Sequence, residues 1–171
     1  MDFMKKGKPI TSESTEETSR IASGFVEKLF TTGGKTCGKA VVVLLQGDLG
    51  SGKTTFVKAV AKTLGIRNTV TSPTFVLEKI YKIPRSAKKE TGFQQLIHID
   101  AYRLADKEDL QSIGWEEIAK DSKNLIFVEW PERVSGIFSE KTAKIGFRFI
   151  DENKRELTFY ATEKQKPDEN S

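Results

Sequence analysis

A glycine-rich segment directly after an aliphatic run constrains this chain more than any other feature. Residues 47–54, GDLGSGKT, satisfy the pattern G-x-x-x-x-G-K-[ST], and the run AVVVLLQ at residues 40–46 precedes them. An unbroken run of this kind is typical of a strand covered on both faces in a parallel sheet. Apolar residues then recur at helical spacing from Phe56 to Leu64, and Gly65 is expected to end that helix. Strand, glycine-rich loop and helix together form the context in which this pattern binds phosphate.

Each residue type in the pattern contributes to holding a nucleotide. Glycines let the loop wrap closely, so that backbone N–H groups point at the phosphates, and the helix beginning near Lys53 adds the positive end of its dipole. Lys53 supplies a catalytic cation for the β and γ oxygens, Thr54 can coordinate Mg²⁺, and Thr55 can assist at the α-phosphate. The nucleotide-binding residues expected from this pattern are Asp48, Leu49, Gly50, Ser51, Gly52, Lys53, Thr54 and Thr55.

Two carboxylates are candidates for the metal site. Asp100 ends the strand-like segment LIHID, and Glu129 ends LIFVE. A P-loop nucleotidase needs a carboxylate at the end of a neighbouring strand to hold its metal, directly or through water. The carboxyl ends of parallel strands meet at one edge of a sheet, so both residues are expected near the phosphates. The spacing alone does not choose between them.

The remaining chain alternates helical and extended patterns. Ser14 and Glu17 form a capping box before an apolar helical face, and this helix is expected to end near Gly33 and Gly34. A third helix, capped by Asp106, is interrupted at Gly114. Extended segments are expected near residues 9–11 and at residues 75–83, 96–100, 125–131, 144–150 and 156–162, the last two forming an antiparallel hairpin.

These patterns predict an α/β fold of the P-loop NTPase kind. It has three layers, a mainly parallel central sheet and an antiparallel hairpin. We expect a single domain over residues 1–171, with residues 1–8 and 164–171 as flexible tails. The segment 84–91, PRSAKKET, is proline-led and basic, and it is expected to be a solvent-exposed hairpin loop.

Composition excludes several classes of protein. One cysteine, Cys37, cannot form an intramolecular disulfide, which favours a reducing, cytoplasmic location. The longest apolar run has six residues, Ala40 to Leu45, whereas a membrane-spanning helix needs about 20, so no membrane association is expected. The net charge of +4 does not by itself indicate nucleic-acid binding. A basic cluster of Lys82, Arg85, Lys88 and Lys89 is more typical of a solvated loop than of an interaction site.

Two further side chains have alternative interpretations. Trp130 lies between Glu129 and a proline, where it can stack on an aromatic ligand or cover the sheet edge. His98 lies within an aliphatic strand, a position more typical of a hydrogen-bonded core histidine than of a catalyst.

Four motifs in a fixed order connect the chain to a known family. They are GDLGSGKTTF at residues 47–56, TSPTF at 71–75, HIDAYRL at 98–104 and VEWPER at 128–133. Together they resemble the TsaE family, the P-loop ATPase of bacterial tRNA threonylcarbamoyladenosine (t6A) synthesis, from about Ser14 to about Thr162. The chain departs from the family in carrying Phe75 where many members have tyrosine, and in a longer basic insert between Ile83 and Gln95.

The resemblance implies roles for individual residues. Thr54 and Glu129 would hold Mg²⁺, and Asp100 would act in catalysis by positioning the attacking water or sensing the γ-phosphate. The S-P-T loop, Ser72 to Thr74, would lie close to the nucleotide and change shape on hydrolysis, with Thr74 as its contact. Aligned by eye with the family, Thr15 and Arg155 are expected to contact the nucleotide, and Trp130 is a further candidate.

The resemblance also implies a function. The chain would be an Mg-dependent ATPase subunit required for t6A modification, with ATP and Mg²⁺ as its cofactors. It would act on the TsaB–TsaD complex, meet tRNA indirectly through that complex, and hydrolyse ATP weakly without these partners. A small P-loop nucleotide or metabolite kinase is the main alternative, although only Arg85 in the insert suits an arginine-rich lid. A non-catalytic ATP-responsive binding module is a third possibility.

Overall fold

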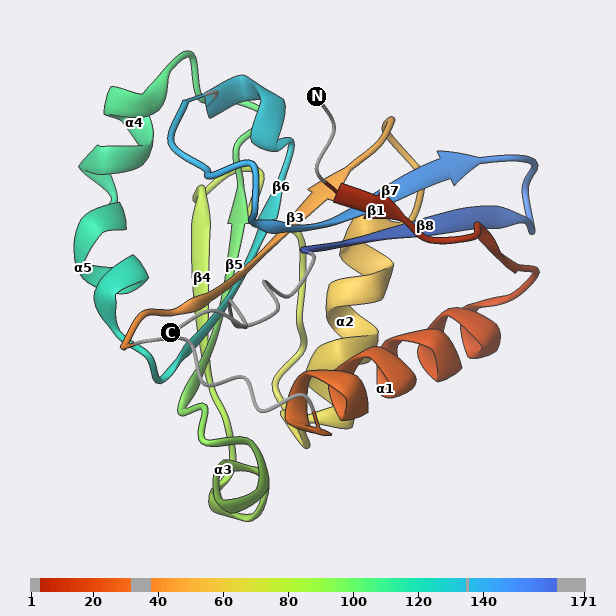
Figure 1. The fold of residues 1–171 in the computed structure, drawn as a ribbon, viewed down its shortest axis with the longest axis horizontal. Helices are drawn as coiled ribbons and strands as arrows, with labels where there is room; N and C mark the ends of the chain where they lie inside the picture. The colour runs from red at the N-terminus through yellow and green to blue at the C-terminus, as the bar shows by residue number, and fades with distance from the viewer. Residues whose placement is uncertain (1–3, 32–37, 135, 163–171) are drawn as a thin grey trace, which may run out of the picture.

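One mixed β-sheet organises the molecule (Figure 1). The computed structural model describes residues 4–31, 38–134 and 136–162. Within these residues the sheet has eight strands in the order β1-β8-β7-β3-β6-β5-β4, and β2 also pairs with β8. The strands are β1 (Met4–Lys6), β2 (Ile10–Ser12), β3 (Val41–Gln46), β4 (Glu78–Lys82), β5 (Gln95–Asp100), β6 (Asn124–Glu129), β7 (Ala143–Phe149) and β8 (Arg155–Thr162).

The centre of the sheet is parallel and its borders are antiparallel. β7, β3, β6 and β5 run in parallel, while β4 pairs with β5 and β8 pairs with β7 in the antiparallel sense. The predicted strand before the glycine-rich loop is therefore central, and four of its six residues are buried. The β7–β8 hairpin is also confirmed, with Lys144 opposite Tyr160 and Phe149 opposite Arg155.

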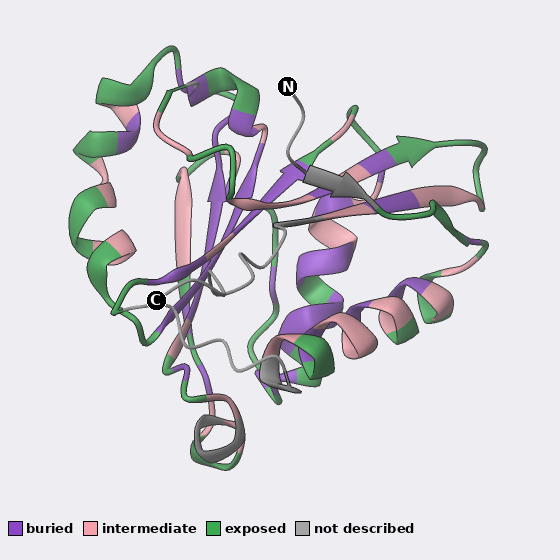
Figure 2. Ribbon diagram, viewed as in Figure 1, coloured by how far each residue is buried: buried purple, intermediate pink, exposed green. Residues whose placement is uncertain are grey.

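Helices cover both faces of the sheet, as the three-layer prediction requires. One core cluster lies between the sheet and two helices, α1 (Thr15–Thr31) and α2 (Lys53–Thr63). A second core cluster lies between the sheet and α4 (Lys107–Ser112), α5 (Trp115–Lys120) and the 3₁₀ helix η1 (Pro131–Val134). The central strands form the continuous buried region in Figure 2. The α/β P-loop fold class predicted from the sequence is confirmed.

Local capping fixes where the helices begin. The backbone N–H of Glu17 donates to Ser14 Oγ at 3.1 Å, and the Glu17 carboxylate accepts from the backbone N–H of Glu13 at 2.6 Å, which confirms the predicted start of α1. The predicted end at Gly33 and Gly34 lies outside the described residues. Gly114, with φ of 78°, separates α4 from α5 where the sequence indicated an interruption.

Three segments differ from their predictions. Residues 4–6, expected to be part of a loose lead-in, form β1 and pair with β8. Residues 75–77, expected to be extended, form a turn in which Leu77 has φ of 64°, so β4 begins only at Glu78. Residues 85–91, expected to be a loop, form the helix α3 (Arg85–Thr91). Pro84 suits the start of a helix, and alanine, lysine and glutamate then favour its continuation.

The described part of the chain contains no helix that is both long and apolar enough to span a bilayer.

Glu78 is expected to make stability depend on pH. Its Oε1 is buried without a hydrogen-bond partner among the described residues, and burial raises the pKa of this carboxyl above its ordinary value of 4.5. Below the pKa that the Glu78 carboxyl has in the unfolded chain, the carboxyl is protonated in both the folded and the unfolded state and has no effect on stability. Above the raised folded pKa the folded state carries a poorly solvated charge, so the group lowers stability.

The substitution Glu78→Gln is therefore expected to stabilise the protein at pH 7 and to have a diminishing effect as the pH falls to 4. Urea unfolding at both pH values measures the difference, and Glu27→Gln on the exposed side of α1 provides a matched control. A stabilisation that grows towards acid pH would contradict this account.

Candidate functional site

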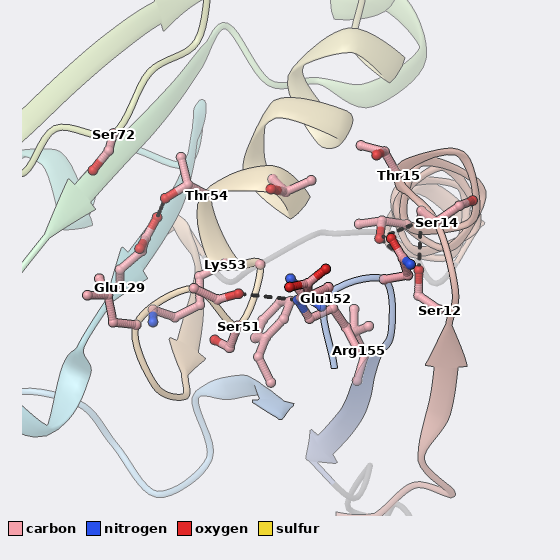
Figure 3. Close-up of a pocket in the computed structure, with 18 of the residues that line it drawn as sticks. Ser12, Ser14, Thr15, Ser51, Lys53, Thr54, Ser72, Glu129, Glu152 and Arg155 are labelled. Atoms are coloured by element: carbon pink, nitrogen blue, oxygen red, sulfur yellow. Dashed lines mark hydrogen bonds between the residues drawn. The ribbon is translucent and has the colours of Figure 1, made fainter. Parts of the chain in front are cut away.

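A pocket of about 530 Å³ lies at the carboxyl ends of the parallel strands. Its walls come from the glycine-rich loop, the start of α1, the loop at residues 72–74, the ends of β5 and β6, and the β7–β8 hairpin. Figure 3 shows Thr54 and Glu129 on one side, with Thr15 and Arg155 approaching from α1 and the hairpin. Every sequence-predicted site residue except Asp48 lines this pocket, so the fold brings together segments that are far apart in the chain.

The glycine-rich loop has the backbone shape that its sequence predicts. Gly50 and Gly52 have φ of 75° and 101°, and Gly52 immediately precedes the first residue of α2. Gly47 has φ of 150°, and a Cβ placed there would lie 2.3 Å from the carbonyl oxygen of Phe147. Only glycine fits where the loop leaves β3, so close packing against β7 helps to fix the loop over the sheet.

Lys53 is held under the loop rather than exposed to solvent. Its side chain donates to the carbonyl oxygens of Gly47 at 2.6 Å and Asp48 at 2.9 Å, and Nζ lies 4.0 Å from the centre of the Trp130 ring. Burial lowers the pKa of the Lys53 ammonium from 10.5, although the charges of Glu129 and other nearby carboxylates oppose this effect. Trp130 therefore contacts Lys53 in addition to covering the sheet edge, where it packs against the core cluster that lies under α4, α5 and η1.

Glu129 lies directly beside the first turn of α2. Thr54 Oγ1 donates to Glu129 Oε1 at 2.8 Å, and His98 Nε2 lies 2.7 Å from the same oxygen. The Glu129 residue is only 3% exposed. The contact results from the pairing of β3 with β6, which places Glu129 level with Leu45, close to where β3 leads into the loop.

Asp100 contacts a different part of the pocket. It is level with Glu129 on the neighbouring strand, as the sequence indicated, but its Oδ2 accepts from Thr74 Oγ1 at 2.5 Å and from Ser72 Oγ at 3.4 Å. The backbone N–H of Tyr102 donates to Asp100 Oδ1 at 2.9 Å. The two carboxylates are therefore distinguished by their partners: Glu129 contacts the helix that follows the phosphate loop, and Asp100 contacts the S-P-T loop.

The opposite end of the pocket is formed by Thr15, at the start of α1, and by Arg155, at the start of β8. Arg155 Nε donates to the carbonyl oxygen of Gly50 at 3.2 Å, and its guanidinium lies 4.5 Å from the centre of the Phe149 ring. The guanidinium is thereby held beside the glycine-rich loop. The side chain of Asp48 does not line the pocket, and this residue contributes its backbone carbonyl to Lys53.

The donor set suits Mg²⁺ bound together with a nucleotide. The described residues contain no cluster of three or more His, Cys, Asp or Glu side chains that could enclose a metal. Mg²⁺ commonly keeps several waters and takes one or two protein oxygens together with phosphate oxygens. Because the Thr54 hydroxyl donates its hydrogen to Glu129, its lone pairs remain available for a metal.

The sequence predicted His98 correctly as a hydrogen-bonded core histidine, but it did not predict the partner of that bond. That partner is Glu129. The available signal was a polar residue within the aliphatic strand LIHID, one strand away from a buried carboxylate.

Comparison with known families supports the resemblance to the TsaE family that the four motifs indicated. Residues 12–157 match the family described as Threonylcarbamoyl adenosine biosynthesis protein TsaE. The described pocket residues all lie within this range.

Individual proteins are similar over most of their lengths. The tRNA threonylcarbamoyladenosine biosynthesis protein TsaE of Treponema pallidum is 37% identical over 147 residues, covering 86% of this chain and 96% of the relative. The protein of the same name in Aquifex aeolicus is 36% identical over 157 residues, covering 90% and 96%. Among solved structures, the crystal structure of the Bacillus protein YdiB matches with a TM-score of 0.67 at 27% identity, covering 94% of this chain and 88% of that one.

Proposed function

The chain belongs to the TsaE family, and on that premise we propose that it is an Mg²⁺-dependent ATPase that serves t6A modification of tRNA. The observation that carries the ATPase proposal is the contact between Thr54 and Glu129 directly after the glycine-rich loop. It joins a hydroxyl and a carboxylate of the kind that P-loop NTPases use for their metal.

The phosphate site is built from the loop and Lys53. Backbone N–H groups of the loop would hold the phosphates, and Lys53 would exchange its two carbonyl partners for phosphate oxygens. Thr54 and Glu129 would hold Mg²⁺, which neutralises developing charge on the phosphates when bound. Arg155 and Thr15 would contact the nucleotide from the far side of the pocket.

Asp100 is the candidate for acting on the attacking water or the γ-phosphate. It is 3% exposed, so a carboxylate charge there is little screened by solvent, and it lines the pocket beside Thr74. Its bonds to Ser72 and Thr74 would couple any change at the γ-phosphate to the S-P-T loop. Hydrolysis would then alter the shape of that loop, which is part of the molecular surface.

The composition of the pocket favours an ATPase that works with partners. Lys53 and Arg155 are the cationic side chains among the described residues that line it. Phosphoryl transfer is accelerated strongly when a further cation is supplied in trans. We therefore propose that turnover is weak in the isolated chain and is stimulated by the TsaB–TsaD complex, through which the chain would meet tRNA indirectly.

The kinase alternative receives less support from the structure. A kinase closes a lid over its phosphates, and the insert was the candidate for that lid. The described residues that line the pocket include none from 84–91, where α3 lies instead.

The proposed function is tested by measuring phosphate release from Mg-ATP with and without purified TsaB and TsaD. We expect slow turnover alone, clear stimulation by the partners, and loss of both in Lys53→Ala. Stimulation that persists in a folded Lys53→Ala protein would contradict the proposal, because turnover would then not depend on the lysine of the glycine-rich loop. Fast, partner-independent transfer of phosphate to a small acceptor would instead identify a kinase, and nucleotide binding without hydrolysis under any condition would identify a binding module.

A further inference from the structure

His98 is a polar side chain in an otherwise apolar part of β5. It has no exposed surface, and its neighbours along the strand, Leu96, Ile97 and Ile99, are also fully buried. Its Nε2 lies 2.7 Å from Glu129 Oε1, while its Nδ1 is buried without a hydrogen-bond partner among the described residues. A buried nitrogen without a partner lowers stability, so core packing alone would favour an apolar residue here.

The surroundings of Glu129 define how the imidazole is oriented. An ionised carboxylate only accepts hydrogen bonds, so the hydrogen between the two groups belongs to His98 Nε2. His98 Nε2 is therefore the donor to Glu129 Oε1, and this bond fixes the orientation of the ring.

Glu129 Oε1 consequently accepts from two sides. Thr54 Oγ1 donates from α2, and His98 Nε2 donates from β5. Two donors from different elements restrict rotation of the carboxylate far more than Thr54 alone would. The second oxygen of Glu129 is then also fixed in direction, before any ligand enters the pocket.

We propose that His98 is a positioning residue that holds the Glu129 carboxylate in place for the Mg²⁺ of the bound nucleotide. This inference rests on the proposed function, because it assumes that Thr54 and Glu129 serve a metal. Hydrogen-bond partners of metal-binding carboxylates commonly change metal affinity by about 10- to 100-fold when they are removed. His98 should therefore affect nucleotide binding only when Mg²⁺ is present.

The test measures binding of a fluorescent ATP analogue to the full chain, once in Mg²⁺ and once in EDTA. The variants are His98→Leu, which removes the donor, His98→Gln, whose amide nitrogen reaches the region of Nε2, and His98→Asn, whose amide nitrogen ends near Nδ1. Phe127→Leu provides the packing control, because Phe127 is fully buried and lies level with His98 on β6. Thermal unfolding of each variant reports the structural cost.

We expect His98→Leu and His98→Asn to lose about tenfold in affinity in Mg²⁺ and nothing in EDTA, whereas His98→Gln keeps most of the affinity in both. Phe127→Leu should lower the unfolding temperature without a Mg²⁺-specific loss. The inference is overturned if His98→Leu loses affinity equally in Mg²⁺ and in EDTA, or loses none in either. It is also overturned if Phe127→Leu loses affinity only in Mg²⁺. If His98→Leu does not fold, the comparison of glutamine with asparagine decides, and equal affinities of these two in Mg²⁺ overturn the inference.

The wild-type protein shows whether the proposed metal site or the proposed role of His98 is wrong. If it binds the analogue no more tightly in Mg²⁺ than in EDTA, the proposed metal site itself is wrong. If it shows the Mg²⁺ effect and the His98 variants match it, the proposed function stands and the positioning role of His98 is rejected.

Discussion

Replacing Lys53 with alanine is expected to reduce ATP turnover by at least about a hundredfold and to weaken nucleotide binding. The ammonium is already largely removed from solvent, with 4% of the residue exposed, and its present partners are backbone carbonyls of the loop that would surround the phosphates. A phosphate oxygen would meet a cation that has little water left to lose, so the interaction is strong. Alanine removes that interaction and leaves the glycine-rich backbone in place.

The control for this result is Lys58→Ala, which removes a lysine from an exposed position on the same helix. It should leave turnover and affinity near the wild-type values. Phosphate release in Mg-ATP and binding of a fluorescent ATP analogue report the two effects, and circular dichroism shows whether each variant is folded. Unchanged turnover in a folded Lys53→Ala protein would place the catalytic centre elsewhere.

The features that the sequence predicted correctly are those fixed by local chemistry. The strand at residues 41–46, the glycine-rich loop and α2 follow from the residues within each segment, and so does the capping of α1 by Ser14 and Glu17. Parallel strands also place their carboxyl ends together, which is why Asp100 and Glu129 could both be predicted near the phosphate loop.

The features that it did not predict depend on contacts between distant segments or on weak local preferences. The partners of Asp100 and Glu129 follow from strand register and from the turn at residues 75–77, which no local pattern announced. The contact of His98 with Glu129 likewise requires β5 to lie beside β6 in one particular register. The segment at residues 85–91 was misjudged because a leading proline and many charges resemble a loop, although its residues favour a helix.

The two carboxylates are expected to respond differently to removal of their charges. Asp100→Asn should lower turnover by about a hundredfold while Mg-ATP affinity stays close to the wild-type value, because Asp100 contacts the S-P-T loop and the backbone of Tyr102 and not Thr54. Asparagine can keep its oxygen on the backbone N–H of Tyr102 and donate from its amide nitrogen to the Thr74 hydroxyl, so the loop should remain in place while the charge is lost.

Glu129→Gln should instead abolish most of the affinity gained from Mg²⁺, and turnover should fall with it. Glutamine can still accept from Thr54 and His98, so the geometry is retained and the missing charge is the variable tested. Glu140→Gln, an exposed carboxylate outside the pocket lining, is the control for the substitution. Affinity in Mg²⁺ and in EDTA, together with turnover at saturating Mg-ATP, separates the two variants. If Asp100→Asn lost the Mg²⁺ effect and Glu129→Gln kept it, the roles of the two carboxylates would have to be exchanged.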